Sequence, residues 1–178
     1  LGPRGWHAKI AWDEMGPGVG PFDGRNRLVF SAGPLVGTGA PTAGRTTVSS
    51  LMPRGYPTPM WGSASMGGYF GAELKYAGYD GLVVKGRAAK QVYVEIDNGN
   101  PAIKDAGHLI GKTTHQTEAI LKQEYGTNAR VLSTGDTDVT DAYYEEGTGI
   151  ENLLGSVEKL SRRISVNLFR QQIIAEVV

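Results

Sequence analysis

Two glycine-rich stretches of this 178-residue chain contain residues suited to binding a flat, phosphate-bearing ligand. The first stretch ends at Gly44 and Arg45, and the second contains Ser65, Gly67 and Gly68. An arginine forms bidentate hydrogen bonds with phosphate, and glycine lets a planar ring approach the backbone. Carbonyl groups in such loops can also bind a magnesium ion that bridges phosphates. A glycine-rich turn region with one surface arginine would look the same, so the residues alone leave both interpretations open.

Short regular elements are expected on either side of these two stretches. Residues 27–31 and 46–51 are rich in apolar and β-branched side chains, which is typical of strands. Residues 69–77 have apolar side chains at helical spacing, and Gly78 follows where a helix would stop. The first N–H groups of that helix would face the second stretch and attract anions.

An irregular loop is expected over residues 52–62, because this segment contains three prolines. It also carries Tyr56, Met60 and Trp61, which are large apolar side chains. These residues either line a pocket or pack beneath the loop, and the sequence leaves both alternatives open.

A helix is expected over residues 6–15, where Trp6 and Ile10 share one face and Gly16-Pro17-Gly18 ends the pattern. This helix contains His7. We expect His7 at the surface or half-buried, and not as a metal ligand, because no second ligand stands at helical spacing.

The middle of the chain is expected to form an antiparallel meander. Residues 81–85 and 91–96 have the composition of strands. Asn98-Gly99 readily adopts positive φ in a tight turn, after which residues 102–104 would return antiparallel.

The clearest helix is expected over residues 113–125, where Thr113 and Gln116 have the spacing of a capping box. A further strand is expected over residues 130–133. From residue 134 onward the chain is polar and acidic.

Beyond this change in composition, residues 150–167 have helical spacing, and the last residues fit a strand or a frayed helix. We therefore expect one domain over residues 1–134. We expect residues 135–178 to add a divergent acidic loop and a C-terminal helix packed on the same domain.

Residues 106–113 (AGHLIGKT) resemble a phosphate-binding P-loop. Ala106 stands where the first glycine belongs, bulky side chains occupy the loop, and no acidic strand that could hold magnesium follows. We expect instead that Thr113 caps the helix and that residues 108–110 hold the loop on the core. Nucleotide binding at Gly111-Lys112-Thr113 is kept as an alternative.

The sequence contains no clear pattern for other kinds of catalytic or metal site. The three histidines are scattered, so no serine–histidine–acid set can be argued. Asp136, Asp138 and Asp141 lack the spacing of a calcium loop and are expected to be solvated.

Composition limits the classes of protein to consider. The formal net charge is zero, which gives no electrostatic sign of nucleic-acid or anionic-membrane binding, and no apolar run approaches the roughly 20 residues of a membrane span. Glycine is enriched (26 residues), mostly in the first half. The chain has no cysteine, so it cannot itself hold an iron–sulfur cluster, and a reducing, cytoplasmic location is expected.

The chain resembles the N-terminal domain of the aldehyde ferredoxin oxidoreductase family of tungsten-pterin enzymes over residues 1 to about 134. The resemblance rests on order and spacing of several segments, of which the second and third are specific: LGPRG, GTGAPTAGR, GGYFGAELKYAGYDG, VYVEI and GHLIGKT. It implies an α+β fold, a β-rich pterin-binding base of mostly antiparallel strands with a few short helices.

The resemblance also implies a role for each residue of the two glycine-rich stretches. Arg45 would bind cofactor phosphate, and Gly67 and Gly68 would lie against the pterin. The backbone carbonyl of Ser65 would bind magnesium. Tungsten, or molybdenum, would be held by the pterin dithiolenes, so no catalytic residue is assigned to this chain.

The implied reaction of the full-length protein is oxidation of an aldehyde to a carboxylic acid, with electrons passed through an iron–sulfur cluster to ferredoxin. That cluster would lie in domains absent from this chain, and self-association is left open. Ser65-Met66 replaces the Asn-Ser of well-known members, which suggests a different branch, such as the aryl-CoA reductase subunits.

The chain begins with Leu and lacks the later cofactor loop of the family, so we expect a fragment or a truncated member. The alternative from another class is a non-catalytic binding module that keeps the fold.

Overall fold

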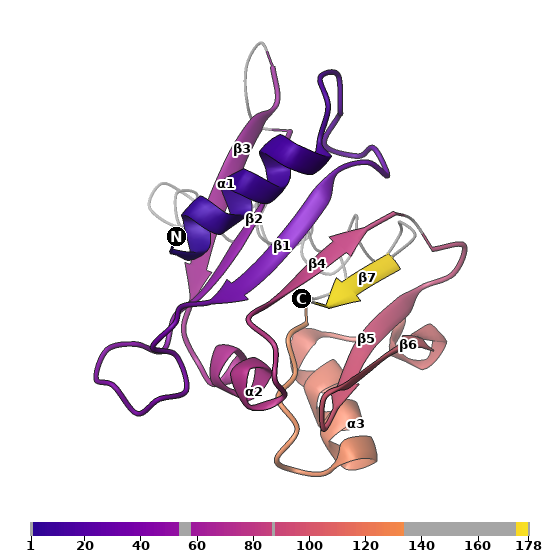
Figure 1. The fold of residues 1–178 in the computed structure, drawn as a ribbon. Helices are drawn as coiled ribbons and strands as arrows, with labels where there is room; N and C mark the ends of the chain where they lie inside the picture. The colour runs from indigo at the N-terminus through magenta and orange to yellow at the C-terminus, as the bar shows by residue number, and fades with distance from the viewer. Residues whose placement is uncertain (1, 54–57, 87, 134–173, 178) are drawn as a thin grey trace, which may run out of the picture.

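The computed structural model describes residues 2–53, 58–86, 88–133 and 174–177 (Figure 1). A five-stranded antiparallel sheet with strand order β3-β2-β1-β4-β7 dominates it, and β5 and β6 form a separate two-stranded sheet. The elements are α1 (Pro3–Glu14), β1 (Arg27–Ala32), β2 (Thr46–Met52), β3 (Met60–Met66), α2 (Phe70–Tyr76), β4 (Gly81–Lys85), β5 (Val92–Asp97), β6 (Asn100–Asp105), the 3₁₀ helix η1 (Gly107–Leu109), α3 (Thr114–Tyr125) and β7 (Ile174–Val177). The predicted α+β fold with antiparallel strands is confirmed.

The apolar core lies on one face of the five-stranded sheet. Leu28 on β1 and Leu82 and Val84 on β4 are buried together, and Phe30 and Val48 pack against them. Leu28 pairs with Val84, and Phe30 pairs with both Leu82 and Val48, so β1 supplies the middle of this face. Leu28 and Val29 point to opposite faces of β1 and both are buried, so the short apolar run of this strand reflects cover on both faces of the sheet.

Helix α1 covers the opposite face of the sheet. The two ring nitrogens of His7 lie 2.7 Å from Ser49 Oγ and 2.6 Å from Ser31 Oγ. Near the other end of the helix, Glu14 accepts a hydrogen bond from Arg27 (2.8 Å). Because Ser31 is near the end of β1 and Arg27 begins it, α1 runs antiparallel to β1, as Figure 1 shows.

The expectation that His7 would be at the surface or half-buried is wrong, because its side chain is 0% exposed. His7 is the one buried residue of α1, and its two serine partners come from strands that begin 20 or more residues later. A neutral imidazole donates from one nitrogen and accepts at the other, and a serine hydroxyl can do either. His7 is therefore a buried, hydrogen-bonded connection between α1 and the sheet.

Burial gives His7 a pH-dependent effect on stability. Desolvation lowers the pKa of His7 from 6.5 to about 4. Between these pH values the unfolded chain binds a proton at His7 that the folded chain does not. The contribution of neutral His7 to the free energy of unfolding is therefore fully present above about pH 6.5, and it decreases as the pH drops toward about 4. The loss is at most about 3 kcal/mol.

Denaturant unfolding of the chain at a series of pH values measures this loss. We expect a His7→Gln variant to show a shallower decline in stability between about pH 6.5 and about pH 4 than the original chain. Equal declines in the two proteins would contradict the assignment.

Trp6 provides a second contact between α1 and the sheet. A Cβ atom added at Gly81 would lie 2.5 Å from Trp6 Cζ3 and 2.6 Å from the carbonyl oxygen of Phe30. Only glycine leaves room for the indole here, so Gly81 allows α1 to approach β4 closely.

The second sheet is a hairpin joined to α3. Its turn contains Asn98 (φ 47°) and Gly99 (φ 81°), as predicted from the Asn-Gly pair. The hydroxyl groups of Tyr93 on β5 and Tyr125 on α3 lie 2.5 Å apart. The predicted antiparallel return is confirmed, but β4 pairs with β1 and β7 and not with β5, so the meander does not include it.

Three further expectations are tested by the structure. Residues 52–62 were expected to be irregular, but the strand β3 begins at Met60 within this segment. A strand was expected over residues 130–133, but these residues have no regular structure. The C-terminal Ile174–Val177 is a strand that pairs with β4. The helix expected over residues 150–167 lies outside the described residues.

None of the helices in the described part of the chain is long and apolar enough to cross a membrane.

Candidate functional site

The pairing of β2 and β3 brings the two glycine-rich stretches together. Thr46 pairs with Met66 and Thr47 pairs with Ser65 in antiparallel register. Arg45 directly precedes β2, and Gly67 directly follows β3, so the 21 residues between them return the chain to the end of the sheet at which β2 begins. We call this region, from Arg45 to Thr46 and from Ser65 to Gly68, the Arg45 end of the sheet.

Close packing of α2 keeps Gly67 and Gly68 at the Arg45 end. A Cβ atom at Gly71 would overlap the Thr46 hydroxyl and would also contact Val36 and Ala32. The helix therefore approaches the start of β2 as closely as a glycine allows. Gly68 has φ of +92°, a conformation that favours glycine, and it turns the chain from β3 into α2.

All four predicted cofactor residues are exposed: Arg45, Ser65, Gly67 and Gly68. A Cβ atom at Gly44 or Gly67 would meet nothing within 4 Å, and neither residue has φ in the left-handed region. Packing and backbone conformation within the described residues therefore do not explain these two glycines. A ligand that approaches the backbone closely would explain them, because a side chain would occupy its place.

The loop between β1 and β2 is held at its start and exposed toward Arg45. Val36 is buried, and Tyr76 of α2 donates a hydrogen bond to the carbonyl oxygen of Gly37 (3.0 Å). Further along, Thr42 has φ of +61°, which is unusual for a β-branched residue. Such strain is often found at binding sites, and here it lies three residues before Arg45.

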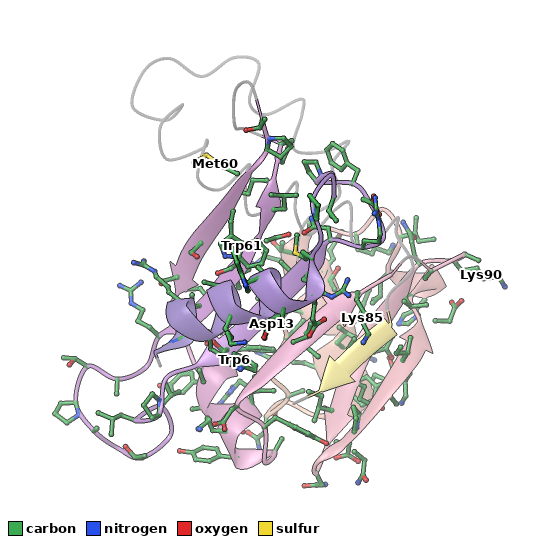
Figure 2. All side chains as sticks on the ribbon, turned by 45° about the horizontal axis from the view of Figure 1, so that its top comes forward. Trp6, Asp13, Met60, Trp61, Lys85 and Lys90 are labelled. Carbon is green, nitrogen blue, oxygen red and sulfur yellow. The ribbon has the colours of Figure 1, made fainter. Side chains whose placement is uncertain are left out.

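Met60 and Trp61 do not belong to this site. Both lie on β3 (Figure 2), and Met60 is 56% exposed. They are at the opposite end of the strand from Ser65, and a strand of this length spans about 20 Å. Tyr56, the third large side chain expected near a pocket, lies outside the described residues.

The P-loop-like stretch forms a helix cap. Thr113 Oγ1 accepts from the Gln116 backbone N–H (3.3 Å), and Gln116 Oε1 accepts from the Thr113 N–H (3.0 Å), so the predicted capping box is confirmed. Of residues 108–110, which were expected to hold the loop on the core, Leu109 is half-buried, whereas His108 and Ile110 are exposed. Ala106, 2% exposed, is the buried residue of this stretch. The preceding β6 belongs to an antiparallel hairpin, unlike the strand of a P-loop unit.

Metal-binding side chains were sought across the described residues. No group of three or more His, Cys, Asp and Glu residues there is placed to hold a metal ion. Asp136, Asp138 and Asp141 lie outside the described part of the chain. A metal ion at the Arg45 end would depend on backbone carbonyl groups and on ligands from elsewhere.

The sequence did not reveal the role of Gly71. In the predicted helix it reads as a weak helix former, with a cost of about 1 kcal/mol relative to alanine. The signal that could have identified it is its place among larger apolar residues on the buried face, three residues before Leu74. A glycine at such a position permits close packing against a neighbouring element.

Comparison with known proteins gives matches over the same region. The family model described as "Aldehyde ferredoxin oxidoreductase, N-terminal domain" matches residues 1–138. The tungsten-containing aldehyde ferredoxin oxidoreductase of Pyrococcus furiosus is 44% identical over 137 residues, which cover 76% of this chain and 22% of that protein. The aliphatic sulfonate oxidoreductase WOR-like subunit of the same organism is 36% identical over 113 residues, 62% of this chain and 17% of that protein.

A solved structure is similar in fold as well as in sequence. It is a chain of the active site complex BamBC of benzoyl coenzyme A reductase, in complex with 1,5 dienoyl-CoA. The TM-score is 0.67 with 41% sequence identity, over 72% of this chain and 19% of that chain. The present chain thus spans about a fifth of the length of the relatives that it matches.

Proposed function

The chain belongs to the aldehyde ferredoxin oxidoreductase family through its N-terminal domain, and from this membership we propose that it forms the cofactor-binding base of a tungsten-pterin oxidoreductase. In this proposal Arg45 binds a phosphate group of the cofactor. Gly67 and Gly68 would lie against the pterin, and the backbone carbonyl of Ser65 would be a ligand of a magnesium ion that belongs to the cofactor. The family resemblance predicted from the sequence is confirmed, including the similarity to an aryl-CoA reductase complex.

The observation that carries this proposal is the pair of glycines that the fold itself does not require. Gly44 lies two residues before β2 and Gly67 directly follows β3, and a side chain on either would point into open space. Gly2, Gly16 and Gly20 also have open space at the Cβ position and ordinary φ, but only Gly44 and Gly67 lie beside Arg45 and Ser65. Close contact between the backbone and a flat ring at these two positions would need glycine.

Arg45 has the properties expected of a phosphate-binding residue. It is exposed, and it forms no ion pair or hydrogen bond with any other described residue. Its guanidinium group is therefore available for the bidentate, charge-assisted hydrogen bonds that bind phosphate strongly.

Ser65 has a position suited to a backbone ligand. β3 is an edge strand of the described sheet, so the N–H and C=O groups of every second residue point away from β2 and have no strand partner there. Oxygen ligands of this kind suit magnesium, which keeps several of its other ligands as water or phosphate oxygen.

When bound, the metal-pterin cofactor would supply the two-electron oxidation of an aldehyde to a carboxylic acid, with tungsten or molybdenum as the metal. The residues of this chain would bind and orient it from one side, and none of them is assigned as an acid or base. We propose that electrons pass through an iron–sulfur cluster to ferredoxin, outside this cysteine-free chain.

The substrate is not determined by the Arg45 end. The names of the similar proteins refer to an aldehyde, an aliphatic sulfonate and a coenzyme A thioester. The residues proposed here would contact the cofactor and not the substrate, so the same base could serve each of these reactions.

Metal and pterin analysis of the natural protein that contains this chain tests the proposal. We expect Arg45→Ala to lower tungsten and pterin content per protein by about tenfold or more, because a charge-assisted phosphate contact is lost. Arg25→Ala is the matched control, since Arg25 is an exposed arginine paired with Asp23.

Two outcomes would contradict the proposal. A well-folded natural protein that contains neither pterin nor a tungsten or molybdenum ion would favour the non-catalytic binding module. Affinity for ATP that is lost on Lys112→Ala would favour nucleotide binding at Gly111-Lys112-Thr113.

A further inference from the structure

Arginine pairing distinguishes two residues from the others. Five arginines lie in the described part of the chain, and three of them pair with carboxylates: Arg25 with Asp23 (2.6 Å), Arg27 with Glu14 (2.8 Å) and Arg130 with Glu73 (3.7 Å). Arg4 and Arg45 are exposed and form no ion pair or hydrogen bond with the other described residues. Among the five described arginines, Arg4 and Arg45 are thus the two whose guanidinium groups have no carboxylate partner.

The direction of α1 places Arg4 toward the Arg45 end of the sheet. His7 contacts Ser31 near the end of β1, and the helix runs antiparallel to that strand. Arg4 precedes His7 by three residues, or about 4.5 Å along the helix axis, and so lies further toward the end of β1. The last residue of β1, Ala32, pairs with Thr46, which follows Arg45. In Figure 1 the N-terminal end of α1 lies at the end of the sheet where β3 terminates.

Arg4 also lies on the face of the sheet that carries Ser65. Ser31, Thr47 and Ser65 form one row across β1, β2 and β3, so their side chains share a face. His7 of α1 contacts Ser31 on this face, and residues three apart lie on the same side of a helix. Arg4 therefore approaches the same face, at the same end, as Ser65.

We propose that Arg4 is a second phosphate-binding residue, which together with Arg45 forms a two-arginine site for the phosphate groups of the cofactor. The inference rests on the proposed function. Neither guanidinium group has a carboxylate partner among the described residues, and the first turn of α1 has no acidic side chain. A phosphate ester with a charge of about −1.5 to −2 would satisfy both.

A two-arginine site also fits the ligand better than one arginine. A magnesium ion at Ser65 would offset part of the phosphate charge, and the remaining phosphate oxygens would still need hydrogen-bond donors. Each guanidinium offers a planar pair of donors to two oxygens, so Arg4 and Arg45 could bind different edges of the phosphate groups.

The test compares four variants of the natural protein: Arg4→Ala, Arg4→Lys, Arg45→Ala and the control Arg25→Ala. Tungsten and pterin content are measured before and after extended dialysis at elevated salt, and thermal unfolding reports on folding. We expect Arg4→Ala to lose cofactor about tenfold faster than the original protein. We expect Arg4→Lys to lose it at an intermediate rate, because charge is kept but the bidentate geometry is lost.

The outcomes separate the two proposals. If Arg45→Ala loses cofactor while Arg4→Ala and Arg4→Lys retain it like the control, Arg4 has no role in binding and the proposed function stands. If both alanine variants retain cofactor like the control, the proposed function itself fails. If Arg4→Ala unfolds at a lower temperature than the original protein, the Arg4→Lys variant decides the question. Cofactor retention by Arg4→Lys equal to that of the original protein overturns the inference. Faster loss of cofactor from Arg4→Lys, at an unchanged unfolding temperature, supports it.

Discussion

Replacing His7 by alanine is expected to lower the free energy of unfolding of the chain by about 3–5 kcal/mol. The imidazole is fully buried between α1 and the sheet, and its removal leaves a cavity. It also removes a hydrogen-bond partner from the hydroxyls of Ser31 and Ser49, which are themselves buried. Ser49 keeps its bond to Ser63 (2.7 Å), so Ser31 is the more affected of the two.

Denaturant unfolding monitored by circular dichroism measures this effect. The exposed His115 on α3 provides the matched control, and His115→Ala should change stability by no more than about 0.5 kcal/mol. A loss of less than about 1 kcal/mol for His7→Ala would show that α1 is held mainly by other contacts, such as Trp6 against Gly81.

Replacing Gly67 by valine is expected to abolish cofactor binding while leaving the fold intact. The substituent would point into open space and the backbone conformation permits it, so stability should change by no more than about 0.5 kcal/mol. The same side chain would occupy the place that we assign to the pterin. Tungsten and pterin content of the natural protein should fall by a factor of about 100, since overlap with a rigid ring cannot be relieved by a small shift.

Two other glycines serve as controls for this substitution. Gly16 also has open space at its Cβ position and ordinary φ, but it lies after α1, so Gly16→Val should leave both stability and cofactor content unchanged. Gly71→Val should lower stability, because its Cβ would overlap the Thr46 hydroxyl. Full cofactor content in Gly67→Val would remove the observation on which the proposed function rests.

Local sequence signals predicted the elements that depend on neighbours in the chain. The helix α3 begins directly after Thr113, because the Thr-x-x-Gln pair satisfies N–H groups at its start, and Gly126 follows its last residue. The hairpin of β5 and β6 forms around Asn98 and Gly99, whose backbone conformations suit those residues. Both features need only a few consecutive residues, so sequence patterns are sufficient.

Elements that depend on distant partners could not be predicted in the same way. β3 is composed of Met, Trp, Gly, Ser and Ala, most of which have little intrinsic preference for strands, and it forms because β2 lies beside it. Residues 130–133 have strand composition but no strand partner among the described residues. Burial of His7 likewise required knowledge that β1 and β2 place serines beneath α1.

The candidate site was predictable as residue types but not as a place. Arg45, Gly67 and Gly68 could be selected from glycine-rich stretches and from the family resemblance. Predicting that Arg45 and Gly67 lie at the same end of a strand pair would have required the register of β2 and β3, which the sequence does not show. The contribution of Arg4 required the direction of α1 relative to β1, which no pattern within the helix specifies.

The most direct test of the account is a crystal structure of the natural protein with its cofactor bound, in which tungsten is located by anomalous scattering. We predict that a cofactor phosphate oxygen lies within hydrogen-bond distance of the Arg45 guanidinium, about 2.7–2.9 Å, and that the pterin lies against the backbone at Gly67. A cofactor bound away from the end of the sheet at which β2 begins and β3 terminates, with Arg45 in contact only with solvent, would contradict the account.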